Sequence, residues 1–230
     1  MNKLFLIALI LFGFATSQRA NADAIFTLNY DSCSGGCGLN GQGTSNNNFG
    51  YVTLHQVDAS TVSVTVSLSQ DVGLDTDFVN TGNGFNHEPF AFNVDKLVTV
   101  TGISNPYFIV GPSPDAISGL GTFSNTIACA SNCPPGASGA DLLGDSLIFT
   151  TSDGSSLSIS DFVANSKGYF FAADVIGPSG NTGEVAANGA PIITNGSDVP
   201  EPTSIALLGS SLIALGAVRF LRRPLNVFRR

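Results

Sequence analysis

The stretch Thr61-Val62-Ser63-Val64-Thr65-Val66-Ser67-Leu68 alternates strictly between hydroxyl and apolar side chains. Successive side chains of a β-strand point to opposite faces, so one face of this stretch is Val/Val/Val/Leu and the other is Thr/Ser/Thr/Ser. This alternation is typical of a strand with one face in a core and the other in water. The stretch therefore predicts a half-buried β-strand at residues 61–68.

Weaker patterns of the same kind recur on both sides of this strand. Further strands are expected at 26–30, 49–57, 96–103, 121–128, 147–151 and 157–160, and 168–176. Ser152-Asp153-Gly154 is interpreted as a hairpin turn, and one short helical turn is expected at 160–166. Short strands separated by Gly, Pro, Asn and Asp predict an all-β fold, a single antiparallel β-sandwich of jelly-roll-like type at residues 23–178. Residues 179–198, rich in Gly, Asn and Ala, are expected to form a flexible linker.

The charges are few and unevenly distributed. Charged residues make up 11% of the chain, against about 25% in soluble globular proteins. Lys96 and Lys167 are the only basic residues between positions 23 and 199, whereas every acidic residue except Glu201 lies there. Such a strongly acidic segment repels phosphate backbones, so nucleic acid is excluded as a partner.

The N-terminus has the features of a secretory signal peptide. Met1-Asn2-Lys3 is followed by an apolar run at 4–15 and by the small-x-small sequence Ala20-Asn21-Ala22. The apolar run is too short for a spanning helix, which needs roughly 20 residues. We expect residues 1–22 to direct export through the Sec translocon, with cleavage after Ala22 and Ala24 as the second choice.

The C-terminus has three parts in a fixed order. Pro200-Glu201-Pro202 precedes an apolar stretch at 203–221. Arg219 lies near the end of that stretch, and Arg222 and Arg223 directly follow it. Nineteen residues at about 1.5 Å each cover roughly 28 Å, about one hydrocarbon core. The arginines are expected to stop the helix on the cytoplasmic side of the inner membrane, with 224–230 as a basic cytoplasmic extension. The acidic segment would then lie outside.

Residues 199–223 resemble the PEP-CTERM sorting signal of Gram-negative bacteria, whose defining tripeptide matches Pro200-Glu201-Pro202. The resemblance implies that exosortase, an integral-membrane transpeptidase-like enzyme, recognises the tail and removes it near the tripeptide. It also implies a transient inner-membrane anchor, delivery to the cell surface or extracellular matrix, and association with exopolysaccharide. The two prolines disfavour regular structure, which would keep the segment extended and open to cleavage.

Four cysteines occur at two equal spacings, Cys33-x3-Cys37 and Cys129-x3-Cys133. An even number in an exported chain indicates disulfides, and three connectivities are possible. We favour the local pairs Cys33–Cys37 and Cys129–Cys133. A zinc site built from the four thiolates is the competing interpretation, disfavoured because export favours oxidation.

No catalytic constellation stands out. His87-Glu88, the aspartates at 71, 75 and 77, and the pair Asp141 and Asp145 resemble fragments of metal, calcium or glycosidase sites, and each lacks the partners such sites need. We therefore expect no cofactor, no resident metal and no enzymatic activity. The interpretation is an exported surface or extracellular-matrix protein associated with exopolysaccharide. A glycan- or ligand-binding module, with calcium as a candidate aid, is the first alternative, and a hydrolase is the second.

Overall fold

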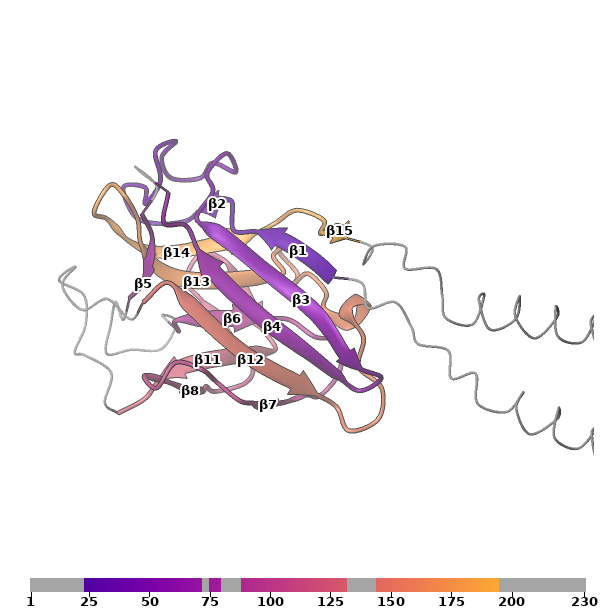
Figure 1. Ribbon diagram of the computed structural model, residues 1–230. Helices are drawn as coiled ribbons and strands as arrows, with labels where there is room; N and C mark the ends of the chain where they lie inside the picture. The colour runs from indigo at the N-terminus through magenta and orange to yellow at the C-terminus, as the bar shows by residue number, and fades with distance from the viewer. Residues whose placement is uncertain (1–22, 72–74, 80–87, 132–143, 195–230) are drawn as a thin grey trace, which may run out of the picture. The chain divides into compact units, whose positions relative to one another are not determined.

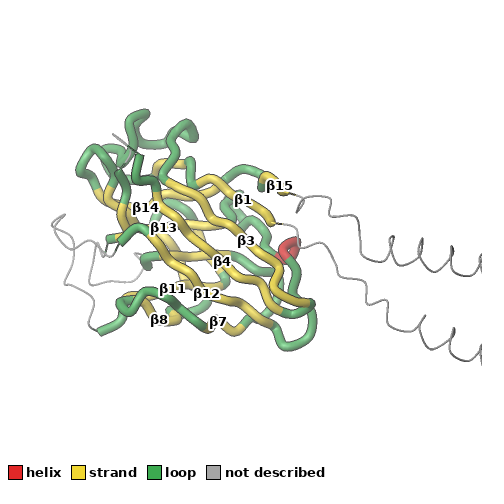
Figure 2. Tube along the Cα trace, viewed as in Figure 1, coloured by secondary structure: helices red, strands yellow, loops and turns green. Residues whose placement is uncertain are grey.

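A computed structural model describes residues 23–71, 75–79, 88–131 and 144–194. These residues form an all-β structure with antiparallel pairing and one 3-10 turn, as Figure 2 shows by colour. The strands are β1 (Asp23–Thr27), β2 (Tyr30–Asp31), β3 (Gly50–Asp58), β4 (Thr61–Leu68), β5 (Asp77–Phe78), β6 (Phe90–Phe92), β7 (Thr99–Thr101), β8 (Phe108–Val110), β9 (Asp115–Ile117), β10 (Gly121–Phe123), β11 (Asn125–Cys129), β12 (Ser146–Ser152), β13 (Phe171–Ile176), β14 (Thr182–Ala187) and β15 (Ile192–Thr194). The all-β prediction is confirmed.

The strands form two large sheets and one small hairpin. The six-stranded sheet has the order β15-β1-β3-β4-β12-β7, and it lies in front in Figure 1. The seven-stranded sheet has the order β2-β14-β13-β6-β11-β8, with β5 paired to β13, and it lies behind. Buried residues of both sheets belong to one hydrophobic core, so the two sheets pack face to face.

Strand β4 has the bounds that the alternation predicts, Thr61–Leu68, and it pairs with β3 on one side and β12 on the other. Its valines at 62, 64 and 66 are fully buried, and its Ser and Thr side chains point away from the core. Because the side chains of a strand alternate with a period of two, a strand whose apolar residues alternate with polar ones buries one face only.

Phenylalanine rings fill the space between the sheets. Phe149 of β12 lies 5.3 Å from Phe92 and 6.0 Å from Phe90, measured between ring centroids, and both of these belong to β6 in the opposite sheet. Phe26 of β1 likewise reaches across to Phe171 of β13, with centroids 4.9 Å apart. Tilted and edge-on contacts at these distances add to the stabilisation that apolar burial provides.

The outer faces of the two large sheets differ in what covers them. On the seven-stranded sheet, small side chains at 91, 172 and 186 face outward and are covered by Ile117, Leu120 and Phe123 of the β9–β10 hairpin and its turn. Phe123 is therefore buried in a second cluster, outside the main core. The small alanines leave room for this third layer, which removes apolar surface from water.

Three local predictions are corrected. Strands β14 and β15 lie within the stretch predicted as a linker at 179–198, and the compact unit ends at Thr194. Gly and Ala are typical of linkers, but on β14 they permit close packing: Gly183 lies against Cys33, and Ala186 and Ala187 are buried. Ser152-Asp153-Gly154 does not join a hairpin, because β12 leads through a loop to the 3-10 turn η2 (Ile159–Asp161). That turn replaces the expected helical turn at 160–166, and the N–H of Ser158 donates to the Asp161 carboxylate.

Candidate functional site

The residues that carry the sorting and cleavage predictions lie outside the described residues. These are Ala20, Ala22, Pro200, Glu201, Pro202, Arg219, Arg222 and Arg223, together with the predicted span at 203–221. Within the described ranges, no helix is long and apolar enough to cross a membrane. The sorting predictions therefore stay predictions.

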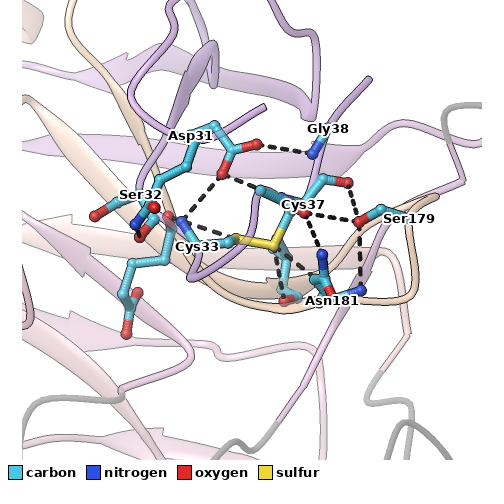
Figure 3. The surroundings of a disulfide bond; sticks show 11 residues. Asp31, Ser32, Cys33, Cys37, Gly38, Ser179 and Asn181 are labelled. Atoms are coloured by element: carbon cyan, nitrogen blue, oxygen red, sulfur yellow. Dashed lines mark hydrogen bonds between the residues drawn. A yellow bond between two sulfur atoms is a disulfide. The ribbon is translucent and has the colours of Figure 1, made fainter. Parts of the chain in front are cut away.

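The predicted disulfide between Cys33 and Cys37 is confirmed. Their Cα atoms are 5.5 Å apart, and both residues are almost fully buried. Cys129 is also disulfide-bonded, and its predicted partner Cys133 lies outside the described residues. The Cys33–Cys37 bond closes a small loop directly after β2, and Ser179 and Asn181 lie beside it (Figure 3).

A buried carboxylate holds this loop from inside. Asp31 is 0% exposed, and its Oδ1 accepts the backbone N–H groups of Cys33 at 3.0 Å and Cys37 at 3.2 Å. Its Oδ2 accepts the N–H of Gly38 at 2.8 Å (Figure 3). Three N–H groups thus converge on one buried carboxyl group, which satisfies these donors away from water.

The loop is also fastened to the β13–β14 hairpin, far away in sequence. Ser179 Oγ donates to the carbonyl of Gly36 at 2.8 Å, and Asn181 Nδ2 donates to the same carbonyl at 2.7 Å. Gly177 faces the carbonyl of Cys37 so closely that a Cβ atom would collide with it. The hairpin and the disulfide loop therefore fit only because position 177 has no side chain.

Asp31, Cys33 and Cys37 are also the one described group whose ligand atoms lie close enough to share a metal ion. The group does not suit a metal. Both sulfur atoms are bonded to each other, so neither is a thiolate, and the Asp31 oxygens already accept backbone N–H groups. The loop is thus a structural device.

A second group of carboxyls, which the sequence analysis missed, lies on the outer face of the seven-stranded sheet. Asp174 and Glu184 stand directly opposite each other in the β13–β14 register and are 0% and 3% exposed. Burial, followed by the negative charge of Glu88, raises the pKa of Glu184 well above its ordinary value. Burial and the charge of Asp115 raise the pKa of Glu88 in turn. Only the pairing of β13 with β14 brings these positions together.

The other fragments considered for metal or acid–base chemistry do not assemble into a site among the described residues. His87 and Asp141 lie outside those residues, while Glu88 is half-buried near Glu184. Burial and the neighbouring charges of Asp75 and Asp145 raise the pKa of Asp77.

A row of Asp23, His55 and Ser63 crosses three adjacent strands of the six-stranded sheet. Asp23 Oδ1 lies 2.6 Å from His55 Nδ1, which is the orientation found in acid–base triads. The strands β3 and β4 are paired on both sides, so their N–H groups are engaged in the sheet and form no oxyanion hole. Both side chains of the pair are well exposed, so water is not excluded either. The row lacks what hydrolysis needs.

This row belongs to a larger surface, which we call the hydroxyl face. It is the outer face of the six-stranded sheet, where the register lines up side chains in rows across β1, β3, β4, β12 and β7. Its members are Thr27, Tyr51, Ser67 and Ser146 in one row, Ile25, Thr53, Thr65 and Ile148 in the next, and Asp23, His55, Ser63, Thr150 and Thr101 in the third. The face is open to solvent and rich in hydroxyl groups.

Comparison of the chain with protein-family models, curated proteins and solved structures returned no match.

Replacing Asp31 with Ala should lower the free energy of unfolding by about 3 kcal/mol or more, because three N–H groups at a buried carboxylate lose their acceptor at roughly 1 kcal/mol or more each. Urea denaturation measures the loss. Asp58→Ala is the matched control, since Asp58 accepts the N–H of Ser60 in an exposed turn where water can replace it, and this variant should lose far less stability than the Asp31 variant. Equal losses in both variants would contradict a structural role for Asp31.

Replacing Glu184 with Gln should flatten the pH dependence of stability. A folded-state pKa above the unfolded value means that stability is fully present at low pH and is lost as pH rises through the folded pKa, with a slope of up to about 1.4 kcal/mol per pH unit. The variant should therefore gain more stability over the wild type at pH 8 than at pH 4.5. Melting temperatures across this range test it, with the exposed Asp71→Asn as control. A gain that is equal at both pH values would show that Glu184 does not titrate in this way.

Proposed function

We propose that this chain is an exported, non-enzymatic surface or extracellular-matrix protein, delivered and processed through a PEP-CTERM-type tail and associated with exopolysaccharide. The observation that carries the proposal is the order of Pro200-Glu201-Pro202, the apolar stretch at 203–221 and the following arginines. Exosortase and the Sec translocon are its partners during export, and the inner membrane holds it until the tail is removed.

The disulfide supports export. Disulfides form and persist in the periplasm and outside the cell, and are rare in the reducing cytosol. The Cys33–Cys37 bond is buried between the loop and the β13–β14 hairpin, where reductants reach it poorly. A chain that depends on this bond is suited to an oxidising compartment.

The beginning of the domain supports signal cleavage after Ala22. Strand β1 begins at Asp23, and Ala24 is 0% exposed and paired with both β3 and β15. Cleavage after Ala24 would remove two paired residues from the sheet, while cleavage after Ala22 leaves β1 whole. The intact strand β1 therefore supports cleavage after Ala22 over cleavage after Ala24.

The end of the domain lies close to the recognition tripeptide along the chain. Because β15 ends at Thr194, five residues separate the sheet from Pro200, and they can span at most about 18 Å. β15 pairs with β1, and Asp23 is opposite Thr194. The first and last residues of the described domain therefore lie next to each other, at the same end of these two strands. An enzyme that cleaves at the tripeptide would act within a short reach of folded protein.

The alternatives are weaker. A hydrolase would need an oxyanion hole and a sheltered site, which the Asp23–His55–Ser63 row lacks. A glycan-binding module is compatible with surface delivery, and the hydroxyl face favours it. The jelly-roll-like topology stays a prediction. The strand pairs β3–β4 and β13–β14 are each a hairpin within a single sheet, β3–β4 in the six-stranded sheet and β13–β14 in the seven-stranded sheet.

N-terminal sequencing of the exported protein should give Asp23 as the first residue, because cleavage there preserves β1. The same measurement on an Ala22→Leu variant, which disrupts the small-x-small pattern, should show uncleaved chain. A mature protein that begins at Ile25 would contradict the assignment.

Replacing Glu201 with Ala should leave the C-terminal fragment attached and reduce surface delivery several-fold, because the tripeptide is the recognition segment in the proposed processing. Immunoblotting with tags on both sides of the tripeptide follows the two pieces. Asp198→Ala removes an acidic residue from the same short segment and should be processed normally. Normal cleavage and delivery of the Glu201 variant would refute exosortase-type processing.

A further inference from the structure

The hydroxyl face differs from an ordinary solvent-exposed sheet surface in its lack of charge. The six strands of its sheet contain no Lys, Arg or Glu. Asp23 is paired with His55 at one margin, and Asp58 lies at the end of β3, where it accepts the N–H of Ser60. Exposed surfaces of soluble domains are usually about 25–35% charged, so this composition is unusual for a face that meets only water.

The chemistry of the face is both polar and apolar. Ser and Thr hydroxyls donate and accept hydrogen bonds, as the hydroxyls of a sugar do. Tyr51 and Ile148 lie among them and are 43% and 42% exposed, which provides flat apolar area for the C–H face of a sugar ring. Thr101 and Thr150 already share a hydrogen bond of 2.8 Å between their hydroxyl oxygens, so part of the array is held in place before any ligand binds.

We propose that the hydroxyl face binds an uncharged polysaccharide, whose chain lies across the strands. The inference deepens the proposed function and rests on it, because it names the surface and the class of glycan through which an exported protein of this kind would associate with extracellular polysaccharide. Apart from Asp23 and Asp58, the exposed acidic residues of the described part of the chain lie outside the six strands of this sheet, where they repel an acidic glycan and leave a neutral one unaffected.

The size of the face argues against a second copy of the chain as its occupant. Five strands about 4.8 Å apart and three rows of side chains about 6.7 Å apart span roughly 19 by 13 Å, about 250 Å². Stable protein–protein interfaces bury about 800 Å² per partner. A polysaccharide chain needs only a narrow track over this area. Its flexible linkages can follow the twist that accumulates across adjacent strands, whereas the flat surface of a crystal cannot.

Affinity electrophoresis tests the inference. The full chain, purified in a polyoxyethylene detergent that has no sugar head group, is run through gels that contain hydroxyethylcellulose, dextran or alginate. The wild type should be retarded by at least one of the two neutral polymers and not by alginate. A double variant, Thr53→Val with Thr65→Val, removes two central hydroxyls and keeps the β-branched shape, so the sheet should remain folded. Its apparent Kd for the retarding polymer should rise at least about fivefold, and Thr65→Glu should raise it about tenfold or more.

The matched controls are Thr122→Val and Thr122→Glu, which change an exposed strand threonine on β10, away from the hydroxyl face. They should bind as the wild type does, and circular dichroism should show the same β content in all variants. The inference is overturned if no neutral polymer retards the wild type, if alginate retards it equally, or if the Thr53 and Thr65 variants bind unchanged. It is also overturned if Thr65→Glu abolishes a dimer seen by light scattering instead of glycan binding. None of these outcomes affects processing of the Glu201 variant, so a failure here is distinct from a failure of the sorting proposal.

Discussion

The packing of two antiparallel sheets around a phenylalanine core is the constraint on which the other features depend. Each sheet buries one face against the other, with Phe149 of the six-stranded sheet against Phe90 and Phe92 of the seven-stranded sheet. The outer faces then meet different conditions. The alanine-rich outer face of the seven-stranded sheet is covered by the β9–β10 hairpin, whereas the Ser- and Thr-rich outer face of the six-stranded sheet stays in water. The open face is the one for which we propose polysaccharide binding.

The disulfide loop shows how a long connection without regular secondary structure is stabilised in a chain with few charges. Residues 32–49 leave the seven-stranded sheet and return to the six-stranded one, and regular secondary structure is absent from this stretch. The Asp31 carboxylate gathers the backbone of the loop from inside, the disulfide closes it, and Ser179 and Asn181 fasten it to the β13–β14 hairpin. Neighbouring acidic groups on β13 and β14 are tolerated because burial raises the pKa of Glu184 and favours its neutral form.

The proposals for route and ligand depend on different parts of the molecule. The export route is proposed from short sequence segments at both ends of the chain. The ligand is argued from a surface that exists only when β1, β3, β4, β12 and β7 lie in register. β1, whose outer face belongs to the hydroxyl face, pairs with β15. Asp23, the first residue of β1, is opposite Thr194, the last residue of β15, so the described domain begins and ends at the same end of this strand pair.

The sequence by itself determined the features that depend on neighbouring residues. Alternation at 61–68 predicts β4 and its two faces, and the short Cys33-x3-Cys37 spacing predicts a disulfide that the structure contains. Tertiary structure alone decided which strands are neighbours. The contact of Asn181 with the disulfide loop and the inclusion of β14 and β15 in the domain were missed because each depends on partners far along the chain. The pairing of Asp174 with Glu184 and the three N–H groups that Asp31 accepts were missed because strand register and loop geometry, which residue spacing alone does not specify, bring these groups together. Of the hydroxyl face, the sequence predicts only the part on β4. The register of the neighbouring strands makes it a continuous surface. Local sequence does not encode this register, because the pairing energy depends on contacts between strands.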